Sequence, residues 1–193
     1  MLSQDGRAMD IPFQLETDLE RRITADPEWQ QGAVWGKVRR GHPEGPVVRH
    51  IAAVLDNLDE QHLDPEGRRK LRPVALFHDT CKFAVDNSRP RTGSNHHARR
   101  ARHLAERFVD DEDVLDIIEL HDEAYNSWSQ GRWRGQWDKA EQRAIRLLTR
   151  LRDRVDLYLA FYRADNNTEG KDQEPLRWFE ELVAMNRDLV RES

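Results

Sequence analysis

Residues 97–108 read HARRARHLAERF and carry the clearest helical pattern in the chain. The apolar positions recur at intervals of three and four residues, which places them on one face of a helix and the charged residues on the other. The residues on that apolar face are His97, Ala101, Leu104, Ala105 and Phe108. A helix of this kind packs its apolar face against a core, so we expect His97 to point inward with its apolar neighbours.

The same period returns along most of the chain. It predicts further helices over residues 11–24, 46–58, 65–81, 113–121, 139–166 and 174–190. Turn-forming residues predict loops over 26–45 and 87–94, and residues 125–138 (YNSWSQGRWRGQWD) show no period. No segment alternates with a period of two, as a half-buried strand would. The predicted fold class is therefore all-α, a helical bundle of roughly six to eight helices.

Composition limits what the chain can be. Its 193 residues are enough for one domain with a core, although the apolar share is only 37% and the charged share is 35%. No stretch has the apolar length of a membrane helix, and the first residues lack the pattern of a signal peptide, so we expect a cytoplasmic protein. The net charge of −5 argues weakly against a dedicated nucleic-acid binder. With Cys81 as its single cysteine, one chain has no multi-cysteine metal site.

The positions of the histidines are unusual. His78, His97 and His121 each fall on the apolar stripe of a different predicted helix, and His50 lies at the edge of another. One such histidine is usually a solvated or hydrogen-bonded residue, but four on separate helices are harder to explain in this way. Asp165 also ends an apolar stripe, and a buried carboxylate is costly unless it is paired or binds a metal. With Asp79 beside His78, these side chains are typical of a site for a divalent cation.

The order of these residues resembles the HD superfamily of metal-dependent phosphohydrolases, whose signature is a histidine, a His-Asp doublet and a distant aspartate. Members with a second metal have two further histidines between the doublet and the last aspartate. Three segments carry the resemblance: GHPEGPVVRH (41–50), which is similar to the HD region of bacterial tRNA nucleotidyltransferases, LRPVALFHDTCK (71–82) and AFYRADNNTEGK (160–171). It covers most of the chain, and it implies one HD domain over 1–193, with a core over 41–170, an N-terminal helix and loop over 1–40 and a C-terminal helix over 174–190.

The resemblance also implies a set of metal ligands. One ion would be held by His50, His78, Asp79 and Asp165; a second would share Asp79 and add His97 and His121. The third histidine of the pattern is His96 or His97, and the helical phase favours His97. The expected cofactor is one or two divalent ions of Mn, Fe, Co, Ni, Zn or Mg, and imidazole ligands favour the transition metals over Mg.

Several cations are candidates for substrate binding. The resemblance implies that Asp79 and Lys82 are catalytic, with Lys82 reaching a phosphate oxygen; a solvated lysine at a helix end is the alternative. A phosphate-binding rim is expected from Lys37, Arg39, Arg40 and His42, which a solvated loop explains equally well. Arg132 and Trp133 have the composition of a base-stacking surface, although a packing cluster against neighbouring helices explains that segment better.

The leading hypothesis is an enzyme, a metal-dependent phosphohydrolase that uses metal-activated water on a nucleotide or another small phosphate mono- or diester. The alternative is a non-catalytic, metal-stabilised HD module that binds nucleotide or RNA. A binding module has no need of the second-metal pair, so His97 and His121 discriminate between the two. The expected partner is a small phosphorylated substrate, with nucleic acid possible but not favoured and no membrane partner. The sequence leaves the oligomeric state open.

Overall fold

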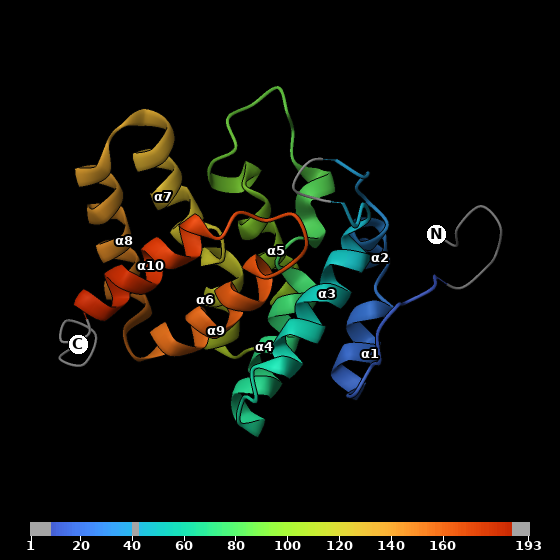
Figure 1. Cartoon of the computed structure of the whole chain (residues 1–193). Coiled ribbons are helices and arrows are strands. Elements are labelled where there is room, and N and C mark those ends of the chain that lie inside the picture. The colour runs from blue at the N-terminus through green and yellow to red at the C-terminus, as the bar shows by residue number, and fades with distance from the viewer. Residues whose placement is uncertain (1–8, 40–42, 187–193) are drawn as a thin grey trace.

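The computed structural model describes residues 9–39 and 43–186, and their regular structure is helical throughout (Figure 1). The elements are α1 (Asp18–Thr24), α2 (Pro27–Ala33), α3 (Val47–Glu60), α4 (Pro65–Phe77), η1 (Thr80–Ala84), η2 (Gly93–Asn95), α5 (His97–Ala105), α6 (Glu112–Leu120), α7 (Glu123–Arg134), α8 (Trp137–Leu151), η3 (Arg152–Arg154), α9 (Val155–Asn166) and α10 (Glu174–Met185), where η marks a 3-10 helix. The predicted all-helical fold is confirmed. Among the described α-helices, eight have nine residues or more, and α1 and α2 have seven each.

The core lies where α3, α4, α6 and α9 meet. Ile51 and Val54 of α3, Val74 of α4 and Ile117 of α6 are fully buried there. Around this centre α5 packs on α6, while α7 and α8 lie side by side with α10 across them (Figure 1). No described helix has both the length and the apolar character needed to cross a lipid bilayer.

Residues 26–45, predicted to be a loop, contain helix α2. Asp26 caps its first turn by accepting hydrogen bonds from the backbone N–H groups of residues 28 and 29, and Pro27 occupies the first helical position. Trp29 is fully buried and its indole N–H donates to the carbonyl oxygen of Leu76 at 2.8 Å. Gly32 packs so closely that a Cβ atom there would lie 1.8 Å from the carbonyl oxygen of Thr80. Helix α2 therefore supports the backbone on both sides of the His78-Asp79 doublet.

Residues 125–138, which show no period in the sequence, lie mostly in helix α7. This helix ends at Gly135, which adopts the left-handed conformation (φ 66°) and closes the helix. Gly131 lies against the ring of Trp137, where a Cβ atom would be only 2.2 Å from the ring. Because α7 packs against α8 and α10 through glycine and tryptophan, its contacts do not follow a simple apolar stripe.

The predicted single helix over 139–166 is wrong, because the chain breaks at Arg152. Helix α8 ends at Leu151, Arg152 has a φ of 53°, and α9 begins at Val155. The guanidinium of Arg154 donates to the carbonyl oxygens of Arg150 and Leu151, each at 3.0 Å, and so satisfies two carbonyl groups that the interrupted helix leaves open. Neither Gly nor Pro marks this break in the sequence.

Three helix ends also differ from the sequence prediction. The helix expected over 11–24 begins only at Asp18. The helix expected over 65–81 ends at Phe77, and a 3-10 turn over 80–84 follows it. The C-terminal helix expected over 174–190 runs from 174 to 185; residues 187–190 lie outside the described part of the chain.

Candidate metal centre

Helix ends deliver the predicted ligands to one place. His50 lies in the first turn of α3, and His78 and His121 cap the C-termini of α4 and α6. His97 is the first residue of α5 and Asp165 lies in the last turn of α9. With Asp79 directly after His78, all six residues predicted as metal ligands come together.

The first group consists of His50, His78 and Asp165. Their candidate ligand atoms all lie within 4.8 Å of one another. The Nε2 atom of His50 is 2.9 Å from Asp165 Oδ1, and the Nε2 atom of His78 is 3.8 Å from the same oxygen. Asp79 Oδ2 is 3.7 Å from both imidazole nitrogens, so this carboxylate oxygen also faces the first group.

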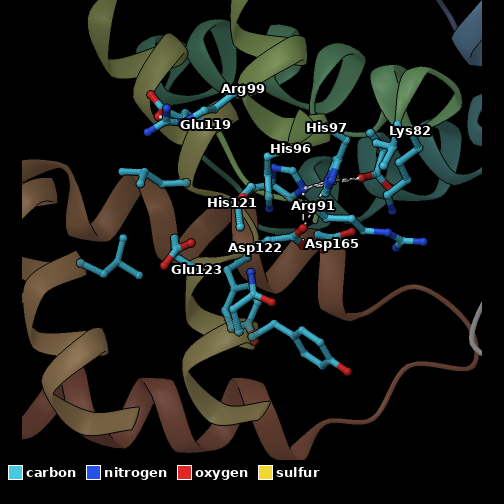
Figure 2. A pocket seen from close by; sticks show the side chains of 18 of the residues that line it. Lys82, Arg91, His96, His97, Arg99, Glu119, His121, Asp122, Glu123 and Asp165 are labelled. Atoms are coloured by element: carbon cyan, nitrogen blue, oxygen red, sulfur yellow. Dashed lines mark hydrogen bonds and ion pairs between the residues drawn. The ribbon is translucent and has the colours of Figure 1, made fainter. Parts of the chain in front are cut away.

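The second group consists of Asp79, His97 and His121, and their candidate ligand atoms also lie within 4.8 Å of one another. Here the carboxylate uses its other oxygen: Asp79 Oδ1 is 3.6 Å from His97 Nε2 and 3.5 Å from His121 Nε2. The two imidazole nitrogens are 3.2 Å apart (Figure 2). Asp79 thus stands between the groups, with one oxygen toward each.

Backbone contacts fix the orientation of two of the rings. His78 Nδ1 is 3.0 Å from the carbonyl oxygen of Ala75, and His121 Nδ1 is 2.8 Å from that of Ile118. A carbonyl can only accept, so Nδ1 carries the proton in each ring. The Nε2 atom then has a free lone pair directed at the group when the ring is neutral. Histidines that bind a metal through one ring nitrogen usually donate a hydrogen bond from the other nitrogen in this way.

The donor atoms are buried and incompletely satisfied. His78 and Asp79 are 1% and 4% exposed, and within the described residues neither His78 Nε2 nor Asp79 Oδ1 has a hydrogen-bond partner. A buried polar atom left in this way costs free energy that a bound cation would recover. Imidazole and carboxylate are also suitable ligands for divalent transition metals. The residues present therefore fit the expected cofactor.

Charges in the site shift the pKa values of the acids and histidines. Burial favours neutral acids, but the ammonium of Lys82 holds the pKa of Asp79 well below its usual range. Burial lowers the pKa of His78 to about 3, so this imidazole is neutral at pH 7. Burial also disfavours a charged His121, but the carboxylates of Asp122 and Asp79 outweigh it and raise the pKa of His121 to about 9. Without a cation, His121 therefore carries a proton that partly balances the carboxylates.

Two lysines lie against these carboxylates. Lys82 Nζ is 2.5 Å from Asp79 Oδ2, and Lys171 Nζ is 2.7 Å from Asp165 Oδ1. Burial opposes the charge of Lys82, but Asp79 and Asp122 raise its pKa, so it stays protonated. Lys82 was predicted from the sequence, whereas Lys171 was not, although it ends the third segment that carries the resemblance.

Sequence reasoning also missed Asp122. Its Oδ2 atom is 3.2 Å from His97 Nε2 and its Oδ1 atom is 3.5 Å from His121 Nε2. It forms a third possible ligand group with His96 and His97. His96 itself accepts the backbone N–H of Ala98 through Nδ1 and caps α5. The sequence signal for Asp122 was its place next to a histidine on an apolar stripe.

Tyr158 contacts the backbone on both sides of Asp122 and so supports the position of Asp122 and His121. Its hydroxyl lies 3.1 Å from the carbonyl oxygens of both Leu120 and His121, and it accepts the N–H of Ala124 at 3.3 Å. These contacts fix the junction between α6 and α7, from which both side chains project.

A cavity of about 1590 Å³ opens beside the two groups. Asp79, His97, His121 and Asp165 line it, whereas His50 and His78 do not. Lys82, Asp122 and Lys171 line it, and so does Arg39 of the predicted rim. Lys37, Arg132 and Trp133 do not line it; the guanidinium of Arg132 instead lies 5.1 Å from the centre of the Trp133 ring. Arg40 and His42, the other two predicted rim residues, lie outside the described part of the chain.

No protein-family model, curated protein or solved structure matches this chain. The chemistry of the site is given by its own donor set. The two groups combine four imidazoles with two carboxylates, His50, His78, His97, His121, Asp79 and Asp165, and the carboxylate of Asp122 lies beside the second group.

Proposed function

We propose that this protein is a metal-dependent phosphohydrolase of the HD type that binds two divalent cations. The observation that carries the proposal is the position of Asp79, whose two oxygens face two separate groups of possible ligands. A carboxylate shared in this way is suited to bridging a pair of cations. Such pairs, when bound, lower the pKa of water towards about 7 and stabilise charge on both oxygens of an in-line displacement.

The residues of the chain have distinct roles in this proposal. His78 and His121 present Nε2 because their Nδ1 atoms donate to the backbone. Asp122 lies against the nitrogens of His97 and His121 that face the second group, so its carboxylate can serve as a further ligand there. Lys82 is protonated and lines the cavity, so its ammonium can contact a phosphoryl oxygen and stabilise the negative charge that develops there.

The second group favours catalysis over the non-catalytic alternative. A module that needs metal only for stability has no use for a second cation site beside the first. His97 and His121 lie on different helices, and yet their Nε2 atoms face the same oxygen of Asp79. The substrate is then a nucleotide or another phosphate ester, hydrolysed by water.

The proposal is tested by measuring bound metal and hydrolysis in the same samples. Purified protein is loaded with Mn²⁺, Co²⁺ or Ni²⁺, its metal content is measured by elemental analysis, and turnover of 4-nitrophenyl phosphate, bis(4-nitrophenyl) phosphate and nucleotides is followed. We expect two cations per chain, with hydrolysis of at least one ester. Asp79→Ala should lose both the metal and the activity.

The matched control is Asp56→Ala, which removes an exposed carboxylate from the same helix as His50. This variant should keep metal and turnover. Full metal loading without turnover of any ester would reject the enzyme and favour the binding module, and an Asp79→Ala variant that still hydrolyses at the wild-type rate would reject the site.

A further inference from the structure

The two cation groups lie part-way along the cavity, not at a closed end. In Figure 2, Arg99 and Glu119 lie to the left of His97, whereas Lys82 and Arg91 extend to its right. All of these residues line the same cavity. A phosphate bound at the groups would therefore have open space on two sides.

Each side carries basic side chains that are available to a ligand. On the side of α5 and α8, Arg146 lines the cavity and forms no ion pair within the described residues, while Arg150 pairs with Asp116 and Glu119. On the other side, Arg91 has only a hydrogen bond to an asparagine side chain and no ion pair among the residues described. Cations on both sides favour a ligand with negative charge or polar groups extending in both directions.

The cavity differs in charge from the chain as a whole. Its lining includes eight Lys and Arg residues against six Asp and Glu residues, although the whole chain has a net charge of −5. Three of those six acids are Asp79, Asp122 and Asp165, which face the cation groups. When the two lysines that lie against Asp79 and Asp165 are set aside as well, the rest of the lining has six arginines against three acids. This excess of positive charge is expected for a surface that binds an extended anion.

Exposed aromatic rings at the cavity indicate what flanks the phosphate. Trp35 and Tyr125 line the cavity with 38% and 44% of their surface exposed. The guanidinium of Arg39 lies 5.9 Å from the centre of the Trp35 ring, which adds a cation beside that aromatic face. Exposed aromatic rings interleaved with arginines are suited to stacking nucleobases.

We propose that the substrate is a phosphodiester that links two nucleosides, with its phosphorus at the cation groups and one nucleoside on each side. This inference rests on the proposed function and selects among its substrates. Water adds its oxygen to phosphorus, the bond from phosphorus to one ester oxygen breaks, and the departing alkoxide takes up the proton that the water gives up, which makes it an alcohol. The products are one alcohol and one phosphomonoester. A monoester as substrate would leave one side of the cavity unused.

The test compares substrates with the metal-loaded wild-type protein. A dinucleoside monophosphate should have a kcat/KM at least about tenfold above that of dimethyl phosphate, a diester with similarly poor alkoxide leaving groups that is too short to reach both sides, because each flanking contact adds binding energy. It should also exceed that of either mononucleotide product. Preference for a mononucleotide would overturn this inference alone; failure to hydrolyse every ester despite full metal loading would overturn the proposed function with it.

Variants on each side locate the contacts. Arg146→Ala and Arg91→Ala should each raise KM for the dinucleoside monophosphate by about three- to tenfold, and each should leave kcat/KM for dimethyl phosphate unchanged. Arg177→Ala, at an exposed position on α10, is the control and should change the kinetic constants for neither substrate. Equal losses on the long and the short substrate would contradict a flanking role for these arginines.

Discussion

The Nε2 atoms of His97 and His121 lie 3.2 Å apart, although the two residues belong to different helices. Two lone pairs at this separation repel unless a proton or a cation lies between them. His121 Nδ1 already donates to the carbonyl oxygen of Ile118, so only Nε2 faces His97. The pair is therefore arranged to share a positive charge.

Removing one ring of the pair should empty the second group and leave the first. We expect His97→Asn and His121→Asn to reduce bound metal from two ions to about one per chain, with a loss of hydrolysis of about 100-fold or more. Elemental analysis after gel filtration measures the stoichiometry. His103→Asn is the control, because this histidine on α5 is exposed and pairs, among the residues that the structure describes, with Glu106 alone. Retention of both ions in His97→Asn would contradict the assignment of the second group.

Cation binding should become tighter as pH rises. Below a pKa of about 9 the metal-free protein holds a proton on His121, and a cation must displace it. Apparent affinity for the second cation should therefore increase by about tenfold per pH unit up to roughly pH 9 and then level off. His78, with a pKa of about 3, adds no such dependence near neutrality.

Calorimetric titration of metal-free protein with Mn²⁺ measures this proton directly. The titration is run at pH 7.5 in two buffers of different ionisation enthalpy. The two observed binding enthalpies should differ by the amount expected when about one proton is released to the buffer for each cation bound at the second site. Identical heats in the two buffers would show that His121 is not protonated.

Two tyrosines on α9 should differ in how loss of the hydroxyl changes the stability of the protein. Tyr162 Oη is buried and has no hydrogen-bond partner among the described residues, so Tyr162→Phe should leave stability unchanged or raise it by up to about 1 kcal/mol. The hydroxyl of Tyr158 contacts three backbone groups, and Tyr158→Phe should cost about 1–3 kcal/mol because these groups are left buried.

Urea unfolding of the metal-free proteins compares the two tyrosine variants, and each serves as the control for the other. A Tyr162→Phe variant that is as destabilised as Tyr158→Phe would mean that the Tyr162 hydroxyl has a partner.

The contact of α2 with the doublet should be sensitive to one methyl group. Gly32→Ala places a Cβ atom on the carbonyl of Thr80, and relief of this overlap requires backbone movement beside Asp79. We expect a cost of about 1–3 kcal/mol in unfolding free energy and weaker cation binding. Gln31→Ala, at an exposed position of the same helix, should change neither value. Thermal unfolding with and without Mn²⁺ is the measurement.

Helical phase was enough to place His50, His78, His97, His121 and Asp165, because each lies on or beside an apolar stripe and the stripes meet in the core. Asp79 was predicted from the His-Asp doublet of the HD resemblance. Helical phase could not place Asp122 or Lys171, because both residues follow the end of a helix and neither lies on an apolar stripe. It also missed the break at Arg152, since the partners of the freed carbonyls come from the side chain of Arg154. Helix α2 was missed for a related reason: its stability comes from Trp29 reaching a carbonyl far along the chain.

The ligands of the first group lie on α3, at the end of α4 and on α9, so one ion would tie together segments from residue 50 to residue 165. In mechanical terms it would be a removable cross-link that closes a long loop of the chain, in a protein whose single cysteine allows no intrachain disulfide. A chelator would then act on the chain much as a reducing agent acts on a secreted protein, by opening this loop.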